Sequence, residues 1–337
     1  MNKGIMIAGT TLVDVIQMVN GYPEQGMLET IKSESFAVGG CLPNTGIDLK
    51  KIDKDVPLKG VARVGNDDRG KFLLSELTRH GVDCTYVKTD DKITTSYSNV
   101  VTVIPTGQRT FFHYRGANAK FSYDDIPFDN LDCDIFHIGY LLLLDILDEE
   151  DEEYGTKMAR VLHDVKAKGV KTSIDVVSET TGKFPKIVVP SLKYCDYCIL
   201  NEVEAGEAAG IPARNEDGTL NYENVKKILY KFMELGVSEC VIVHCPECGF
   251  ALDKNGRYEE VGSLNLPKGY IKGSVGAGDA FCAGSLYGLY KGMDLKEILK
   301  FASAVAACNL SAPDSISGVR SYEETKKLEG QFERRSK

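Results

Sequence analysis

Short runs of β-branched and apolar residues alternate with segments of helical periodicity along most of the chain. These runs occupy residues 3–8, 135–138, 172–176, 197–200 and 240–244. In the segment 153–168, apolar residues recur at the spacing of one helix face, and Gly169 ends the pattern. Strands that alternate with helices favour βαβ units, in which right-handed crossovers join parallel strands. We therefore expect an α/β fold whose mostly parallel central sheet is covered by helices on both faces.

Two segments, 11–38 and 92–116, interrupt this alternation because they lack long helical periods. Residues 94–104 and 110–115 instead alternate in polarity, and the turn residues 105–108 separate them, which predicts an antiparallel hairpin. A chain of 337 residues also exceeds the usual single core of about 250–300 residues. We expect 11–38 and 92–116 to form a small β lid. The large domain would then comprise residues 1–10, 39–91 and 117–330.

Composition excludes several classes of protein. Forty basic and forty-nine acidic residues give a net charge of −9 without a basic stripe, so nucleic acid is not an expected partner. The apolar runs 5–8 and 141–144 are too short for a signal peptide or for a membrane span, which needs about 20 residues. Ten cysteines without an export signal indicate a reducing compartment, so we expect a cytoplasmic protein.

Two cysteine pairs, Cys195 with Cys198 and Cys245 with Cys248, have the spacing of zinc ligands. Cys198, however, lies within the apolar run 197–200, where a buried strand would direct the thiol into packing. A zinc-dependent protein is therefore an alternative that metal analysis would test.

The most informative segment is a glycine-rich turn that precedes an apolar, small-residue helical stretch. Gly276, Ala277 and Gly278 would form the turn at the helix N-terminus, where free amides and the helix dipole create an anion hole. Asp279 follows immediately; it could merely cap the helix, or it could accept a proton during phosphoryl transfer. The chain has neither a Walker-type phosphate loop nor a Gly-x-Gly-x-x-Gly motif after its first strand.

This segment resembles the second signature of the ribokinase-like, or PfkB, carbohydrate kinase family. Three other matches follow the family's order: Gly39-Gly40-Cys41-Leu42-Pro43-Asn44 is similar to its first signature, Gly65-Asn66-Asp67-Asp68-Arg69-Gly70 to its Gly-x-Asp-x-x-Gly stretch, and Asn201-Glu202-Val203-Glu204 to its Asn-x-x-Glu motif. The matches cover nearly the whole chain. The resemblance implies a ribokinase-like α/β/α three-layer body with a small β-sheet lid.

The resemblance also implies roles for individual residues on the acceptor side. Asp279 would be the catalytic base, and the backbone of Gly276, Ala277 and Gly278 would stabilise the transferred phosphoryl group. Asp14, Gly40 and Asn44 would bind the substrate. Apart from the resemblance, Arg115 follows the predicted hairpin and could clamp a substrate or a phosphate. Taken singly, Asp14 could be a turn carboxylate, Gly40 a simple turn, Asn44 a helix cap and Arg115 a solvated surface residue.

On the nucleotide side, the resemblance implies that ATP is contacted by Asn201, Ser274 and Asn309. It also implies that Glu204 binds Mg²⁺, and because Mg²⁺ tends to retain its waters, we expect this contact to be made through water. A plain acidic helix start is the alternative for Asn201 and Glu204. Asp175 is a further candidate on the metal side. Gly273-Ser274-Val275 replaces the family's usual Asp-Thr, which makes a monovalent cation site doubtful.

We therefore expect an ATP- and Mg²⁺-dependent kinase that phosphorylates a hydroxyl, preferably a primary one, of a small sugar or sugar derivative. A nucleoside kinase of the same family and a non-catalytic sugar sensor are the alternatives. An apolar lid face would favour a nucleoside, and a ring of polar groups would favour a sugar. The strand 173–177 lacks the Asn and Arg that often follow its Asp in sugar-acid and fructose kinases, so the acceptor stays open. Exposed lid strands also suggest a homodimer.

Overall fold

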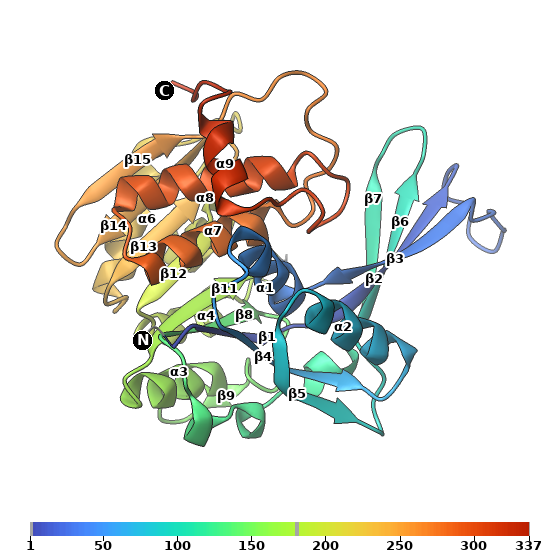
Figure 1. The fold of residues 1–337 in the computed structure, drawn as a ribbon, viewed down its shortest axis with the longest axis horizontal. Coiled ribbons are helices and arrows are strands. Elements are labelled where there is room, and N and C mark those ends of the chain that lie inside the picture. Colours follow the sequence, from blue (N-terminus) through green and yellow to red (C-terminus); the bar gives the residue numbers. More distant parts are fainter. Residues whose placement is uncertain (1–2, 179–181, 337) are drawn as a thin grey trace.

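Two β-sheets organise the chain in the structure, a computed structural model that describes residues 3–178 and 182–336 (Figure 1). The larger sheet has nine strands in the order β15-β14-β13-β12-β11-β8-β1-β4-β5. Their bounds are β1 (Ile5–Gly9), β4 (Leu58–Gly65), β5 (Asp83–Asp90), β8 (Ile135–Leu141), β11 (Lys171–Val176), β12 (Tyr197–Asn201), β13 (Cys240–His244), β14 (Cys248–Asp253) and β15 (Tyr258–Gly262). Neighbours from β13 to β5 pair in parallel, whereas β14 and β15 add antiparallel strands at one edge. The predicted mostly parallel sheet is therefore confirmed.

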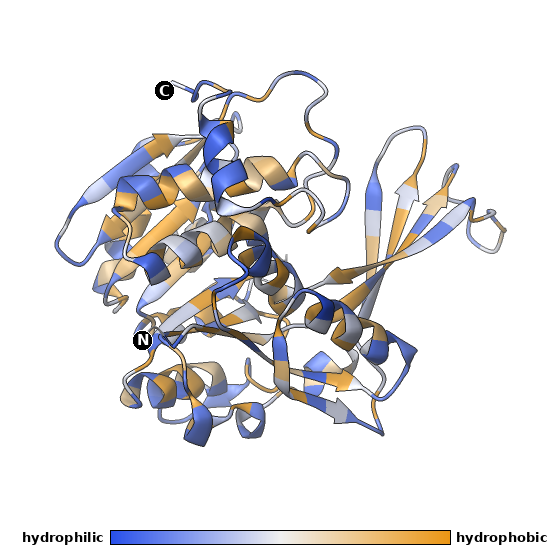
Figure 2. Cartoon of the chain, viewed as in Figure 1, coloured by the Kyte–Doolittle hydropathy of each residue, from blue (hydrophilic) through white to orange (hydrophobic). Residues whose placement is uncertain are grey.

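Helices cover both faces of this sheet and complete three layers (Figure 1). They are α1 (Cys41–Ile52), α2 (Asp68–Arg79), α3 (Lys157–Ala167), α4 (Phe184–Leu192), α5 (Glu202–Ala209), α6 (Tyr222–Glu234), α7 (Ala277–Lys291), α8 (Leu295–Asn309) and α9 (Tyr322–Glu329). Side chains of α3, α4, α5 and α6 share one apolar core, and those of α1, α2, α7 and α8 share the other. Figure 2 shows the apolar strands between these layers.

Helix α3 begins later than the sequence pattern predicts. A short hairpin, β9 (Glu150–Asp151) with β10 (Gly155–Thr156), takes up the start of the expected segment. Thr156 then caps the helix, because its hydroxyl accepts a hydrogen bond of 3.1 Å from the Ala159 amide. Three single-turn helices, η1 (Gly116–Lys120), η2 (Tyr123–Asp125) and η3 (Phe128–Asn130), lead back from the smaller sheet to β8.

The smaller sheet stands away from the large domain (Figure 1). Its order is β3-β2-β6-β7, with β2 (Leu12–Val19), β3 (Ser33–Gly39), β6 (Tyr97–Val103) and β7 (Arg109–Tyr114). Strands β6 and β7 pair antiparallel across the predicted turn, so that hairpin is confirmed. Because side chains alternate along a strand, one face carries Asp14 and the opposite face carries Val15.

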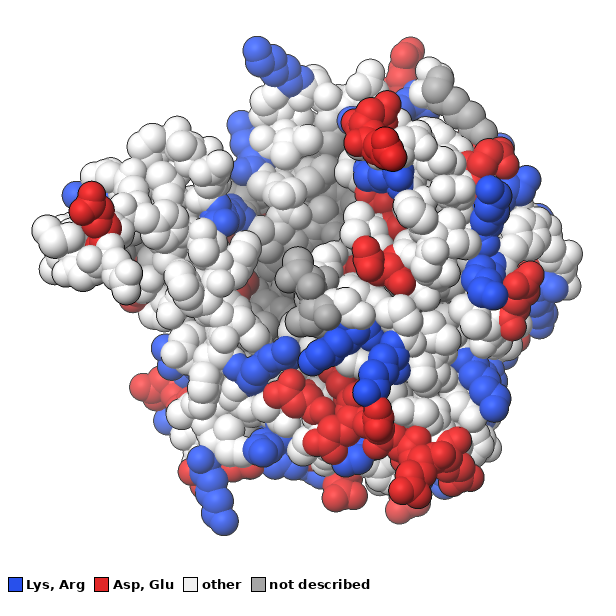
Figure 3. Space-filling model, turned by 180° about the vertical axis from the view of Figure 1, so that it is seen from behind, with Lys and Arg blue, Asp and Glu red and all other residues white. Residues whose placement is uncertain are grey.

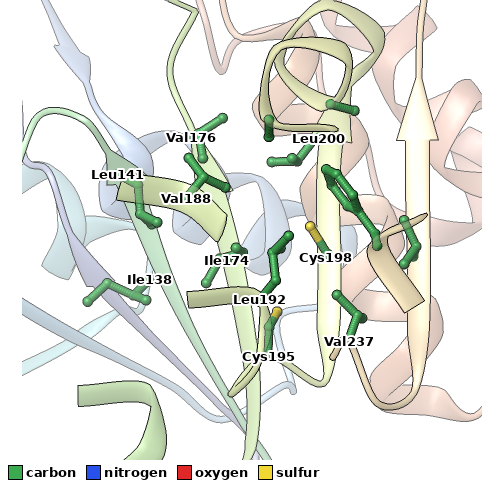
Figure 4. Packing of buried hydrophobic residues seen from close by; sticks show 14 of the residues in the cluster. Ile138, Leu141, Ile174, Val176, Val188, Leu192, Cys195, Cys198, Leu200 and Val237 are labelled. Atoms are coloured by element: carbon green, nitrogen blue, oxygen red, sulfur yellow. The ribbon is translucent and has the colours of Figure 1, made fainter. Parts of the chain in front are cut away.

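The cysteine pairs lie in the apolar core. Cys195, Cys198, Cys245 and Cys248 are all buried. Figure 4 shows Cys195 and Cys198 among aliphatic side chains such as Ile174 and Leu192. Burial raises the pKa of the Cys198 thiol well above its ordinary value, which keeps the thiol protonated. Such surroundings suit cysteine as a small apolar residue.

No helix within residues 3–178 and 182–336 is both long and apolar enough to cross a membrane.

Asp67 joins the smaller sheet to the large domain. Its Oδ1 accepts hydrogen bonds from the Gly70 amide (2.8 Å) and the Thr95 hydroxyl (2.6 Å), and its Oδ2 accepts one from the Thr95 amide (2.8 Å). The same carboxylate therefore caps α2 and fixes the segment that enters β6. Gly65 permits this contact, because a Cβ there would lie 2.5 Å from the Ile93 carbonyl oxygen and the Thr95 amide nitrogen.

We predict that Asp67→Ala lowers the free energy of unfolding by about 2–4 kcal/mol, because it removes a helix cap and hydrogen bonds to a charged group. Chemical denaturation would measure this loss. Asp68→Ala is the matched control: Asp68 is the next residue and its side chain is fully exposed, so we expect a change below about 0.5 kcal/mol. Equal losses in both variants would contradict the assignment.

Candidate active site

The candidate site lies at the edge of the large sheet where the parallel strands end. In open α/β sheets this edge forms the ligand-binding crevice. Thr10 follows β1, Tyr140 lies near the end of β8, Asp175 lies near the end of β11, and Asn201 ends β12. The N-terminus of α7 faces the same edge, which brings Asp279 to residues distant in sequence.

Asp279 is buried and held by two donors from different elements. Its Oδ1 accepts a hydrogen bond from the Tyr140 hydroxyl at 2.5 Å, and its Oδ2 accepts one from Asn44 Nδ2 at 3.0 Å. Burial raises the pKa of Asp279 to about 6, although the hydrogen bonds from Tyr140 and Asn44 oppose that shift. The group can therefore be ionised near neutral pH and still take up a proton, as a general base must.

Asn44 is not the helix cap that the simpler interpretation allowed, because it lies inside the first turns of α1. Its side chain joins Asp279 to the segment after α8: Asn44 Oδ1 accepts from the Ser315 hydroxyl at 2.9 Å. Asn309 supports the same segment, because its Nδ2 donates to the Ser315 carbonyl at 2.7 Å. Asn309 is completely buried, and its side chain holds Ser315 in place. The direct contact of Asn309 with a nucleotide stays a prediction.

The turn before α7 has the geometry of an anion site. Gly276 occupies the N-cap position with φ of 77°, and a Cβ there would lie 2.6 Å from the Ser315 Cβ. The Ala277 amide donates a long bond of 3.3 Å to the Ser274 carbonyl. In the described part of the chain no hydrogen bond engages the Gly278 amide. Gly278 and Ser274 are exposed, so the helix N-terminus is open to a ligand.

A pocket beside this network lies between the smaller sheet and the large domain, where Figure 3 shows the surface hollowed. Asp14, Ile16, Ala37, Val100, Arg109 and Phe111 line it from the smaller sheet, and Val275, Pro313, Asp314 and Ser315 line it from the large domain. Burial raises the pKa of Asp14 to about 7; the charge of Arg109 lowers it and that of Asp279 raises it. Asp14 is thus poised to donate or accept a hydrogen bond at neutral pH.

Gly40 and Arg115 have different surroundings from Asp14. Gly40 begins α1 with φ of 92°, and a Cβ there would lie 2.6 Å from the Thr10 carbonyl oxygen, so only glycine allows α1 to start so close to β1. Arg115 donates to the Leu142 carbonyl at 3.1 Å and forms an ion pair of 3.5 Å with Asp145. Arg115 does not line the Asp14 pocket.

Asn201 and Glu204 form a capping box at the start of α5. The Asn201 side chain accepts from the amides of Val203 and Glu204, and Glu204 Oε2 accepts from the Asn201 amide at 3.1 Å. Ser178 donates to Glu204 Oε1 at 2.8 Å. Asn201 and Glu204 therefore cap the helix, as the alternative interpretation predicted. A ligand role for either residue would be additional to this capping role. Burial raises the pKa of Glu204 to about 7, opposed by hydrogen bonds from Ser178 and Asn201.

Asp175 lies in a buried cluster with His137 and Cys282, whose potential ligand atoms are all within 4.8 Å of one another. His137 Nδ1 and the Ser173 hydroxyl are 2.9 Å apart, and burial lowers the pKa of His137 to about 3. The histidine is therefore neutral. Burial also raises the pKa of Asp175 well above its ordinary value.

Three residues of the site carry no signal in the sequence pattern. Tyr140 lies near the end of an apolar strand, Arg109 begins an alternating one, and Ser315 lies in a turn after α8. Arg109 lines the Asp14 pocket, whereas Arg115 does not. Arg109 Nη2 donates to the Pro313 carbonyl at 3.3 Å, which connects the smaller sheet to the large domain. Only the tertiary arrangement reveals these contacts.

Comparison with known proteins agrees with this geometry. A family model described as pfkB family carbohydrate kinase matches residues 2–321. A ribokinase from Arabidopsis thaliana is 26% identical over 326 residues, which cover 96% of this chain and 80% of the plant protein. The chain belongs to the pfkB family of carbohydrate kinases.

Solved structures share the fold. The structure of Arabidopsis thaliana ribokinase complexed with ribose and ATP matches with a TM-score of 0.79 at 22% identity, covering 97% of this chain and 99% of that one. A candidate ribokinase II from E. coli, in complex with ATP and Mg²⁺, matches with a TM-score of 0.75 at 20% identity and covers 97% and 99% of the two chains. The ribokinase-like fold is thus established, with its large and small sheets.

We predict that Gly276→Ala lowers the free energy of unfolding by about 1–3 kcal/mol more than Gly292→Ala does, as measured by chemical denaturation. Both glycines flank α7 with positive φ, 77° and 67°. A Cβ at Gly276 would meet Ser315, whereas a Cβ at Gly292 would meet nothing within 4 Å. The difference between the two variants therefore isolates the contact with Ser315. Equal losses would show that Ser315 does not restrict the turn.

Proposed function

We propose that the protein transfers the γ-phosphoryl group of ATP to a hydroxyl, preferably a primary one, of a small sugar or sugar derivative. The observation that carries the proposal is the buried Asp279 carboxylate, which lies directly behind the open glycine turn at the N-terminus of α7 and beside the Asp14 pocket. A proton acceptor next to an anion site is the arrangement that phosphoryl transfer to an alcohol needs.

In the proposed reaction, Asp279 accepts the proton of the acceptor hydroxyl, and the acceptor oxygen forms a bond to the γ-phosphorus. The bond between that phosphorus and the bridging oxygen breaks, and ADP leaves. Amides at the turn formed by Gly276, Ala277 and Gly278 stabilise the charge on the transferred group. The open Gly278 amide supports this role more directly than the Ala277 amide, which already has a partner.

For the nucleotide side, we assign ATP contacts to Asn201, Ser274 and Asn309, with Asn309 acting through Ser315. Both oxygens of Glu204 already accept hydrogen bonds, which favours a contact with Mg²⁺ through water rather than direct ligation. Glu204 and Asp175 lie close enough that the charge of Glu204 raises the pKa of Asp175, and a cation would relieve this excess of negative charge. Bound Mg²⁺ would neutralise charge on the phosphates. A monovalent cation stays doubtful.

For the acceptor side, we assign substrate contacts to Asp14, Gly40 and Asn44, and we transfer to Arg109 the role expected of Arg115. Residues 11–38 and 92–116 would act as a lid on the large domain. The bond between Arg109 and the Pro313 carbonyl supports this role, because it already connects the small sheet to the large domain. A closed lid would exclude water and so prevent hydrolysis of ATP.

A nucleoside is the second candidate acceptor, and the character of the pocket favours it. The wall that the smaller sheet contributes includes Ile16, Ala37, Val100 and Phe111, with charged groups only at Asp14 and Arg109. Phe111 is 56% exposed, so its ring is available for stacking. An apolar wall above a hydroxyl-binding floor suits a molecule with a ribose end and a planar end.

The opposite face of the smaller sheet supports a homodimer. Phe112 pairs with Asn99, and Phe36 and Asn99 both pair with Val15, so Phe36 and Phe112 share the face away from the pocket. Both are more than half exposed. Apolar side chains on an open sheet gain stability when a second copy covers them.

All ten cysteines are free, which suits the reducing cytoplasm.

We predict that Asp279→Asn reduces acceptor-dependent ADP release by about 10²–10⁴-fold, because the general base is lost. The assay combines ATP, Mg²⁺ and a panel of pentoses, hexoses, sugar acids, polyols and nucleosides. The wild-type kcat/KM should rise with pH through about 6, where Asp279 becomes ionised. ATP binding, measured by calorimetry, should persist in the variant. If acceptors raise the melting temperature of the wild type but none stimulates ADP release, the protein is a sensor and the kinase proposal fails.

We predict that Phe111→Ala lowers the ratio of kcat/KM for nucleosides to kcat/KM for free sugars by roughly tenfold, because a stacking surface is lost. Phe112→Ala is the matched control: it is the next residue, is 58% exposed compared with 56% for Phe111, and lies on the opposite face. Its ratio should stay unchanged even if its oligomeric state changes. Equal ratios in the wild type and both variants would exclude Phe111 from the choice of acceptor.

A further inference from the structure

Tyr140 makes the shortest contact with the candidate base. Its hydroxyl donates to Asp279 Oδ1 at 2.5 Å, although 139 residues separate the two in sequence. The backbone of Tyr140 is fixed as well, because its amide donates to Thr10 Oγ1 at 3.2 Å. Thr10 Oγ1 also accepts from the Cys41 amide at 3.0 Å. Tyr140 is therefore anchored at the junction of β1, α1 and β8.

The surroundings of Asp279 disfavour a charged carboxylate. Burial is the first reason. The second is that acidic groups on several elements lie close to Asp279, so that the charge of Asp279 raises the pKa values of these groups. These are Asp14 on β2, Cys41 and Asp48 on α1, Asp175 on β11, Glu204 on α5 and Cys282 on α7 itself. Each of them can only add negative charge when it ionises. The ionised form of Asp279 therefore depends on hydrogen-bond donors.

Two donors engage different oxygens of the carboxylate. Asn44 engages Oδ2 and Tyr140 engages Oδ1. An ionised carboxylate has about four acceptor positions, so it keeps capacity for an incoming hydroxyl, although the Thr45 side chain also lies close enough to lower the pKa of Asp279. The two bonds together fix the plane of the carboxylate while leaving it able to take a proton.

We propose that Tyr140 is a positioning residue for the phosphoryl-transfer reaction, whose hydroxyl keeps Asp279 ionised and correctly oriented in its buried pocket. The inference rests on the proposed role of Asp279 as general base. Tyr140 does not itself take the proton of the acceptor: burial, with the charge of Asp279, raises the pKa of Tyr140 well above its ordinary value. Its phenol therefore stays protonated and remains a donor throughout the working pH range.

The test is the pH profile of kcat/KM for Tyr140→Phe. Loss of the hydrogen bond to the ionised Asp279 carboxylate should move the acidic limb of the profile to higher pH by about one unit. At about pH 6 the variant should be roughly fivefold slower than the wild type, and at about pH 8.5 the two should agree to within about threefold. A loss that is equal at every pH would overturn the proposal, because it would assign Tyr140 a purely structural or a direct catalytic role.

Tyr123→Phe is the matched control. The Tyr123 hydroxyl donates to Asp164 Oδ2 at 2.6 Å, so the variant also removes a short tyrosine-to-aspartate bond, but between η2 and α3. The acidic limb of this variant should coincide with that of the wild type. A shift of the same size in both variants would show that the effect is not specific to Asp279 and would overturn the proposal.

A second measurement does not depend on activity. The folded-state pKa of Asp279, about 6, is above its ordinary value of 3.8, so ionisation of Asp279 opposes folding as the pH rises through 6. Without Tyr140 that pKa rises further. The loss of melting temperature in Tyr140→Phe, relative to wild type, should therefore be larger at about pH 8.5 than at about pH 5.

The two measurements separate the possible failures. If the wild type shows no acceptor-dependent turnover, the proposed function fails, and the melting temperatures still decide whether Tyr140 stabilises the ionised carboxylate. Equal losses of melting temperature at the two pH values would overturn that role. The melting temperature of Tyr140→Phe could fall more at the higher pH while the acidic limb of kcat/KM for an active enzyme stays unshifted. That result would overturn the role of Tyr140 in the reaction.

Discussion

A carboxylate removed from water at the N-terminus of α7 is the feature on which the rest of the site depends. An isolated buried charge is unstable, so it must be supplied with donors or become neutral. Asn44 donates to Asp279 from α1, and Tyr140 donates to it from β8. Gly40, the N-cap of α1, allows that helix to begin against β1, and β1 and β8 are parallel neighbours, so α1 and β8 lie close together beside α7. The helix and sheet layers of the large domain thus meet around the Asp279 carboxylate.

The sequence was sufficient for the framework and for the placement of Asp279 in the first turn of α7. Runs such as 197–200 and 240–244 became parallel strands because a strand buried on both faces needs consecutive apolar residues. The turn at Gly276 and the position of Asp279 were predictable because glycine at a helix start has a local cause, its positive φ. The hairpin of β6 and β7 followed from alternation and turn residues, which are also local.

The remaining features depend on contacts between distant segments. Tyr140 belongs to an apolar strand and has no local pattern that connects it to Asp279. Arg115 was predicted to bind the substrate, and that role stays a prediction. Arg109 was not predicted, and it lines the pocket because alternation along β7 places Arg109 and Phe111 on the same face as Asp14. The start of α3 was missed because the hairpin of β9 and β10 has only two residues in each strand. Asn201 and Glu204 show a limit of reasoning from motifs, since the same pattern is compatible with a helix cap, which the structure shows, and with a ligand site, which stays a prediction.

The two sheets divide the work of the site between them. The hydrogen-bond donors to Asp279 come from the large domain, whereas most of the pocket wall, including Phe111 and Arg109, comes from the smaller sheet. If this pocket binds the acceptor, as proposed, substitutions on one face of four short strands would alter which molecule is accepted without disturbing the carboxylate, its donors or the glycine turn. The proposed roles would then let new acceptor preferences evolve separately from the proton-accepting group and from the core of the large domain.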